Sequence, residues 1–180
     1  RMRFRNARSR TKRIKMINRI NKAAGKLFNT GSWPQATYGK EAMGVTPGEI
    51  KQLRAMAADA CSGDAPGKCP TAVIWLCLGE RMDPLRRAVA DQIQMWFDTA
   101  CSFDPVDVAR AWWTQKERFR SSPSPWSIVK GPIGATIGTL DLLQWVPLSP
   151  RKWIDPSGNV WKWHEETSIA ALIQELMAHL

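Results

Sequence analysis

The sequence has no acidic residue in its first forty positions. Arg1 to Lys40 contains 12 of the 26 Lys and Arg residues, and the first carboxylate is Glu41. The remaining 140 residues carry 14 basic and 16 acidic side chains, so the whole excess of +10 charges lies in the first segment. An excess of one sign confined to one segment favours a polyanionic partner.

Long apolar runs are missing as well. No stretch reaches 18 consecutive apolar residues, and the basic start lacks the apolar core of a signal peptide. We therefore expect no membrane span and an intracellular protein, in the nucleus rather than the cytoplasm. The chain begins with Arg1 instead of Met, in the middle of a basic pattern, which favours a fragment of a longer protein.

The four cysteines and two histidines follow no metal-binding pattern. The cysteines are Cys61, Cys69, Cys77 and Cys101. Their spacings of 8, 8 and 24 match no zinc motif, and neither His164 nor His179 is close to them in sequence. Cys77 lies in an apolar run and is predicted to be a small core residue. The sequence predicts no bound metal and no cofactor.

Catalytic motifs are also missing. There is no G-x-S-x-G, no P-loop, no H-E-x-x-H and no paired-cysteine motif. The acidic doublet Glu165-Glu166 precedes a predicted helix, where the helix dipole alone favours acids. Asp155 is interpreted as a turn residue. We expect no catalytic residue in this chain, and whether a parent protein is an enzyme stays open.

Basic residues recur with helical periodicity in the first segment. Six of them are spaced by 4, 3, 4, 3 and 4, which places them on one line of a helix. They are Arg8, Lys12, Lys15, Arg19, Lys22 and Lys26. Apolar residues occupy the opposite face, namely Ile14, Ile17, Ile20, Ala24, Leu27 and Phe28. The pattern predicts one helix, continuous to Phe28, that packs through its apolar side.

This cationic line contains no acidic partner. Each pair of like charges at i,i+4 destabilises a helix by a few tenths of a kcal/mol. Their presence here therefore indicates that an external anion binds the helix and offsets the repulsion. We interpret the six cations as contacts to a nucleic-acid backbone. An acidic protein or membrane surface, and a solvated face kept for solubility, remain alternatives. Trp33 and Tyr38 are candidates for stacking on a base, although core positions under a loop are the preferred interpretation.

Capping signals predict a mainly α-helical fold. Thr46 to Glu49 reads as a capping box with proline at the first helical position, and Asp83-Pro84 and Asp104-Pro105 follow the same logic. Ala72 to Leu78 is nearly all apolar and is predicted to be a short buried helix. Ten tryptophans in 180 residues predict an aromatic core or binding face.

The last third of the chain predicts a small sheet. Asp155 to Gly158 suits a tight turn between two short strands, and an amphipathic helix is expected from Ser168 to Leu180. Ser121 to Pro125 interrupts the helical pattern. We predict a helical bundle with a basic N-terminal helix and a C-terminal β-hairpin followed by a helix, in two domains covering 1–120 and 121–180.

Six segments carry a resemblance to a known family, namely Lys26–Gly31, Pro34–Gly39, Gly44–Pro47, Trp126–Ala135, Asp141–Pro147 and Trp153–Trp161. Together they resemble reverse transcriptases of non-LTR (LINE-type) retrotransposons, particularly those of dinoflagellate genomes. The first three look like the region after the polymerase core, and the others look like the connection before a ribonuclease H domain. The polymerase's paired aspartates and a ribonuclease H carboxylate set do not occur in this sequence.

The resemblance implies a thumb-like helical bundle that grips a template–primer duplex through its sugar-phosphate backbone. We therefore expect a non-catalytic, sequence-independent binder of RNA–DNA or DNA duplex. With six phosphate contacts, the logarithm of the binding constant K should fall against the logarithm of the salt concentration with a slope of about −5. A helical protein-interaction module with a basic targeting arm, or a retroelement remnant without function, are the alternatives.

Overall fold

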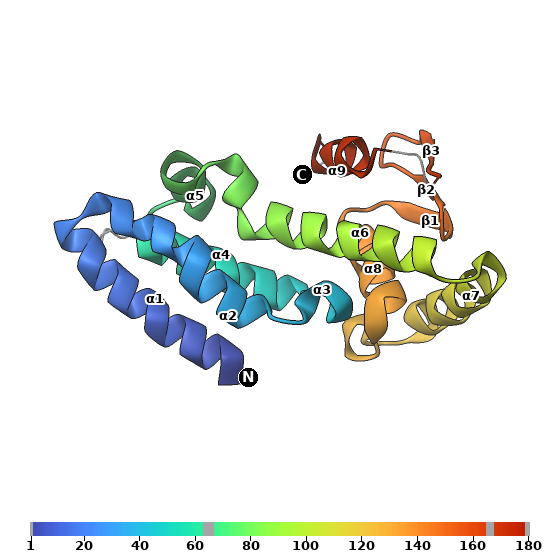
Figure 1. Ribbon diagram of the computed structural model, residues 1–180, viewed down its shortest axis with the longest axis horizontal. Helices are drawn as coiled ribbons and strands as arrows, with labels where there is room; N and C mark the ends of the chain where they lie inside the picture. Colours follow the sequence, from blue (N-terminus) through green and yellow to red (C-terminus); the bar gives the residue numbers. More distant parts are fainter. Residues whose placement is uncertain (1, 63–66, 165–167, 179–180) are drawn as a thin grey trace. The chain divides into compact units, whose positions relative to one another are not determined.

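The computed structural model describes residues 2–62, 67–164 and 168–178. The fold is mainly α-helical, with a small antiparallel sheet near the C-terminus followed by a helix, as predicted (Figure 1). The chain forms two compact units. Unit 1 comprises Arg1–Tyr38 and Thr46–Ala88, and unit 2 comprises Gly39–Val45 and Val89–Leu180. The domain boundary predicted from the sequence, between residues 120 and 121, differs from the division into these two units. It stays a prediction.

Unit 1 is built from helices alone in the part that the structure describes. Its elements are α1 (Met2–Ile20), η1 (Lys22–Lys26), η2 (Phe28–Ser32), α2 (Trp33–Thr37), α4 (Pro47–Cys61), α5 (Pro70–Leu78), η3 (Glu80–Met82) and the start of α6 (Pro84–Ser102). The helix α1 contacts α2, α4, η1 and η2. Phe28, Leu53 and Ile74 are fully buried and form the centre of this unit.

The predicted capping box fixes the start of α4. The Thr46 Oγ1 accepts a hydrogen bond from the Glu49 amide at 3.2 Å, and the Glu49 Oε2 accepts one from the Thr46 amide at 3.0 Å. These bonds satisfy two backbone donors that the first turn leaves without helical partners. The side chains on the inner face of α4 are buried, namely Ile50, Leu53, Met56, Ala57 and Ala60.

The predicted single helix up to Phe28 is wrong, because α1 ends at Ile20. Asn21 has extended backbone angles, φ −123° and ψ 107°, and its Oδ1 accepts a hydrogen bond from the Ala23 amide at 3.0 Å. An asparagine side chain that bonds the backbone locally competes with the helical pattern. The chain therefore turns at Asn21 and continues as the 3₁₀ helix η1.

The predicted apolar seam of α1 is also partly wrong. The residues that α1 buries are Ala7, Thr11, Ile14 and Asn18. Thr11 donates to the Ser32 hydroxyl at 3.0 Å and Asn18 donates to the Cys61 carbonyl at 3.0 Å, so polar groups complete this seam. Ile20, predicted to face inward, is 92% exposed, and Ile17 is exposed too.

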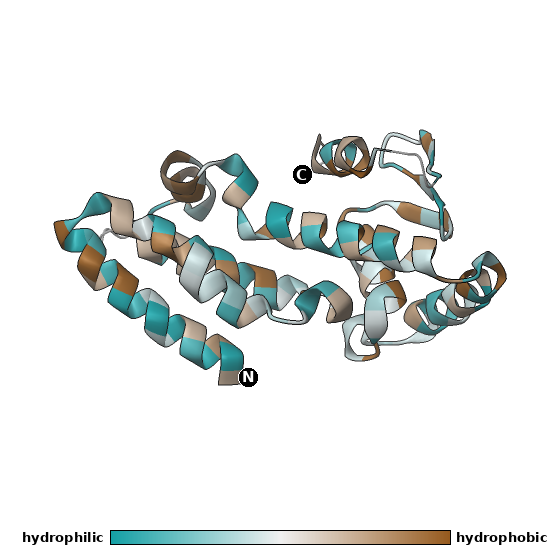
Figure 2. Ribbon diagram, viewed as in Figure 1, coloured by the Kyte–Doolittle hydropathy of each residue, from teal (hydrophilic) through white to brown (hydrophobic). Residues whose placement is uncertain are grey.

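The apolar helix α5 was predicted to be buried, and most of it is not. Figure 2 shows α5 coloured largely as hydrophobic. Ile74 is its one buried residue, whereas Leu76 is 87% exposed and Trp75 is exposed as well. Cys77, predicted to be a core residue, is exposed. Composition alone indicated burial, but the α4 surface that α5 contacts covers only one side of it.

Unit 2 combines helices with the sheet. Its elements are α3 (Lys40–Met43), the rest of α6, α7 (Pro105–Ser121), η4 (Pro125–Ser127), α8 (Gly131–Leu142), β1 (Val146–Ser149), β2 (Lys152–Ile154), β3 (Val160–Lys162) and α9 (Ile169–Ala178). Asp104 caps α7 as predicted, since its Oδ1 accepts a hydrogen bond from the Val106 amide at 2.8 Å. Gly138 on α8 lets the Trp126 ring approach, because an added Cβ would lie 3.0 Å from that ring.

The sheet has three antiparallel strands in the order β1-β2-β3. The predicted hairpin is β2 and β3, in which Trp153 pairs with Trp161. The strand β1 was not predicted. It contains Pro147, which cannot donate to a ladder, and its register to β2 shifts between Pro147 and Ser149. The predicted last helix is α9, and its expected end at 179–180 lies outside the described residues.

Tryptophan rings form the core of unit 2. Those that are fully buried are Trp96, Trp112, Trp145, Trp153 and Trp163. The Trp96 and Trp112 ring centroids lie 5.0 Å apart, and those of Phe97 and Trp163 lie 5.2 Å apart. Such tilted pairs stabilise a core beyond simple burial. Trp113, next to Trp112 in the sequence, is 51% exposed.

Candidate nucleic-acid interface

The two units differ sharply in charge. Unit 1 contains 17 Lys and Arg residues and five Asp and Glu residues, a net charge of +12. Unit 2 contains nine basic and 11 acidic residues, a net charge of −2. The electrostatic attraction of the chain for a polyanion therefore comes from unit 1.

Four of the six predicted cations lie on one flank of α1. Arg8, Lys12 and Arg19 are exposed, and Lys15 is half-buried. The Arg8 guanidinium donates to the Gln52 Oε1 at 3.2 Å, which places this flank beside α4. The structure thus brings these four residues together in the line that their 4-3-4 spacing predicts.

A groove of about 280 Å³ follows this flank between α1 and α4. Its lining residues are Arg8, Thr11, Lys12, Lys15, Gln52, Ala55, Met56 and Asp59. Asp59 is the one carboxylate among them, and its Oδ1 lies 4.0 Å from the Lys15 Nζ. The cations of α1 thus form one wall, and Asp59 partly neutralises Lys15.

Lys22 and Lys26 do not continue this line. Both are exposed, but they lie on η1, beyond the turn at Asn21. The 3₁₀ helix has three residues per turn, so it does not maintain the register of α1. The predicted six-residue line is therefore four residues on α1 and two on a separate element.

A second cationic flank lies on the other side of α1, and the sequence interpretation missed it. The Arg3 guanidinium donates to the Tyr38 carbonyl and lies over the Tyr38 ring, 4.9 Å from its centroid. Arg10 donates to the Gly31 carbonyl at 3.1 Å. The spacing of seven between Arg3 and Arg10 was the signal for a shared helix side.

The two stacking candidates occupy different environments. Trp33 is buried, with the Arg87 guanidinium 4.9 Å from its ring centroid, as expected for a core position. Tyr38 is 72% exposed and is covered on one face by Arg3. A base has access only to the Tyr38 ring, so this residue is the remaining candidate.

The titratable groups that drew attention in the sequence have structural partners. Burial tends to raise the pKa of Asp155, but hydrogen bonds from Trp161, Asn159 and the Ser157 amide outweigh it and lower the pKa to about 2. Its carboxylate holds the predicted turn. Burial, aided by the neighbouring Cys77 thiol, raises the pKa of Cys61 to about 12, which makes that thiol unreactive.

Metal sites and further acids give no additional candidate. In ranges 2–62, 67–164 and 168–178 no three His, Cys, Asp or Glu side chains are grouped as metal ligands. The acidic doublet Glu165-Glu166 lies outside the described residues.

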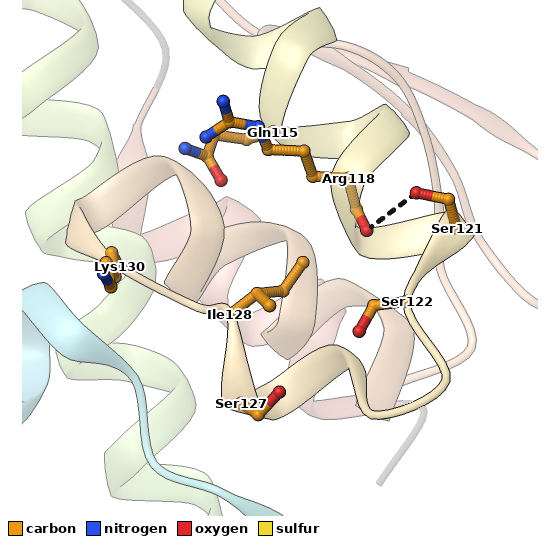
Figure 3. Close-up of a pocket in the computed structure, with 7 residues that line it drawn as sticks. All are labelled: Gln115, Arg118, Ser121, Ser122, Ser127, Ile128 and Lys130. Atoms are coloured by element: carbon orange, nitrogen blue, oxygen red, sulfur yellow. Dashed lines mark hydrogen bonds between the residues drawn. The ribbon is translucent and has the colours of Figure 1, made fainter.

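A hollow of about 460 Å³ lies on unit 2 (Figure 3). It is lined by Gln115, Arg118, Ser121, Ser122, Ser127, Ile128 and Lys130. Arg118 and Lys130 are exposed and belong to a unit with net negative charge. Substitutions of Arg118 and Lys130 can therefore serve as matched controls for substitutions that remove charges from α1.

Among the residues that the structure describes, no helix is long and apolar enough to cross a membrane. Comparison of the chain with protein-family models, curated proteins and solved structures finds no match. The resemblance to non-LTR reverse transcriptases therefore stays an expectation from the sequence.

Proposed function

We propose that unit 1 binds nucleic-acid duplex, DNA or RNA–DNA, through phosphate contacts made by α1. The observation that carries the proposal is that α1 docks through a seam without charges. Ala7, Thr11, Ile14 and Asn18 face the unit, so every Lys and Arg of α1 is left at its flanks or on its outer side. The net charge of +12 supports the same partner, since phosphate contacts dominate sequence-independent affinity.

The chain acts in this proposal as a non-catalytic part of a reverse transcriptase-like polyprotein. The basic helical unit suits the thumb role that the resemblance implies, in which the duplex is held by its backbone. A nuclear location follows from that role. These assignments rest on the resemblance and on the charge of α1.

The alternative function is a helical protein-interaction module in which the basic segment is a targeting arm. The exposed apolar helix α5 favours it, because Trp75 and Leu76 present apolar surface to solvent. A duplex-binding assay at physiological salt separates the two functions, since the module is expected to show no binding. A retroelement remnant would show neither activity.

The deciding experiment is the salt dependence of binding to short DNA and RNA–DNA duplexes of unrelated sequence. The full chain is expected to bind both types of duplex. Within each type, its affinity should be similar for duplexes of different base sequence. Replacing Arg8, Lys12 and Arg19 together by Gln should flatten the slope of log K against log salt by about 3, at about 0.9 per lost contact.

The matched control removes three charges from unit 2. Arg118, Arg120 and Lys130 are exposed, and their replacement by Gln changes the net charge of the chain by the same amount. The slope of this control should equal that of the unchanged chain. Equal slopes for both triple variants would contradict the assignment of binding to α1.

A further inference from the structure

The outer side of α1 forms a ridge with cations on both flanks. Ser9 and Met16 lie opposite the buried seam, and both are exposed. At about 100° per residue, Arg8, Lys12 and Arg19 project roughly 50–90° to one side of this ridge. On the same geometry the exposed residues Arg3, Arg10 and Arg13 project roughly 50–130° to the other side, and the exposed Arg5 lies within about 30° of the ridge line.

The ridge stands free on the surface of unit 1. The contacts of α1 with α2, α4, η1 and η2 are made on the side of its buried seam (Figure 1). Met16 is exposed in the last third of the ridge and Ile20 at its end. The line from Arg3 to Arg19 spans about 24 Å at about 1.5 Å per residue, so α1 offers four turns to a partner.

We infer that α1 inserts its ridge into the major groove of B-form DNA, with one phosphate backbone against each cationic flank. An α-helix is about 10–12 Å wide and the B-DNA major groove is about 12 Å wide, so a helix inside it meets both strands. A single cationic line meets one strand only. Two lines on opposite sides match the two backbones of a duplex groove.

The inference names the substrate form for the proposed function and rests on that function. The major groove of A-form RNA is deep and narrow and does not admit a helix. Only one flank of α1 therefore contacts duplex RNA. An RNA–DNA hybrid is expected to make a number of contacts between those of duplex RNA and of B-form DNA. The ridge itself carries Arg5 and Ser9, both exposed, so contacts to base edges would come from these two residues.

The flanks are held at their width by the fold. Arg3 and Arg10 donate to the Tyr38 and Gly31 carbonyls, which fixes one guanidinium nitrogen of each side chain and leaves further guanidinium donors for phosphate. Arg8 is likewise held by the Gln52 side chain. Such positioning lowers the entropy that the contacts lose on binding.

The test compares salt slopes for DNA and RNA duplexes of the same sequence. The unchanged chain should give a slope of about −5 on DNA, from six phosphate contacts, and of about −3 on duplex RNA, from three. Replacing Arg3, Arg10 and Arg13 by Gln should flatten the DNA slope by about 3 and leave the RNA slope unchanged. Replacing Arg8, Lys12 and Arg19 by Gln should flatten both.

A single substitution distinguishes a lost phosphate contact from a folding defect. Arg13→Gln keeps the two carbonyl contacts and should flatten the DNA slope by about 0.9 with no effect on RNA. Equal slopes on DNA and RNA, or a DNA slope that ignores Arg13, would overturn groove insertion while leaving duplex binding in place. Absence of binding to every duplex would instead refute the proposed function.

Discussion

Unit 1 contains 17 of the 26 basic residues and two of the ten tryptophans, whereas unit 2 contains nine basic residues and eight tryptophans. Eight of the 17 basic residues of unit 1 lie on α1, and the tryptophan rings of unit 2 are mostly buried. Under the proposed function, ligand binding and core stability therefore depend on different residues in different units. Variants in one unit should change one property and leave the other unchanged.

The largest expected effect is on the stability of unit 2. Trp112 is fully buried against Trp96, so Trp112→Ala should lower the free energy of unfolding by about 3–5 kcal/mol. The neighbouring exposed Trp113 is the matched control, and its replacement by Ala should cost about 1 kcal/mol or less. Urea unfolding followed by fluorescence measures both. Similar losses for the two variants would contradict the tryptophan core.

The second effect concerns acid stability in unit 2. The folded-state pKa of Asp155 is about 2, below the value of about 3.9 of an unfolded aspartate, so folding favours its carboxylate. Its stabilising contribution is complete above about pH 4 and is lost as the pH falls towards 2. Asp155→Asn should remove this pH dependence, which unfolding at pH 5 and at pH 2.5 measures. An unchanged difference between these pH values would contradict the role of this turn.

The smallest effect sharpens the assignment of the groove on unit 1. Asp59→Asn removes the carboxylate next to Lys15 and should raise duplex affinity about two- to fivefold, as a surface ion pair contributes about 0–1 kcal/mol. Asp107 forms a comparable exposed ion pair with Arg110 in unit 2. Asp107→Asn should leave affinity unchanged. A larger gain from Asp107→Asn would place the binding surface elsewhere.

Local signals in the sequence predicted the helix starts correctly. Thr46, Asp83 and Asp104 each accept hydrogen bonds from the first turn that follows, and such bonds depend only on neighbouring residues. The end of α1 was missed although its signal is local. The Asn21 side chain caps η1 by accepting from the Ala23 amide, and the apolar periodicity up to Phe28 concealed this signal.

Features that depend on distant parts of the chain could not be predicted. The strand β1 pairs with β2 despite Pro147, since the partner strand supplies the ladder that local propensity disfavours. The apolar composition of α5 indicated burial, but the surface available to cover it is not encoded in its own residues.

The candidate interface was predicted in part. The spacing of Arg8, Lys12, Lys15 and Arg19 placed them on one line of α1 as expected. The second flank, with Arg3, was not predicted, because its residues lie outside the 4-3-4 repeat of the first flank. Helix periodicity reports which residues share a side, but the docked side of α1 became known only from its buried residues.

The most direct test of the central claim is lysine acetylation of the full chain with and without a DNA duplex, followed by mass spectrometry. With duplex at ten times its Kd, about one tenth of the protein is free, so acetylation of Lys12 on α1 should slow by about tenfold. Lys152 and Lys162, exposed on the sheet of unit 2, should react at unchanged rates. Protection of Lys152 and Lys162 with Lys12 left reactive would contradict the account.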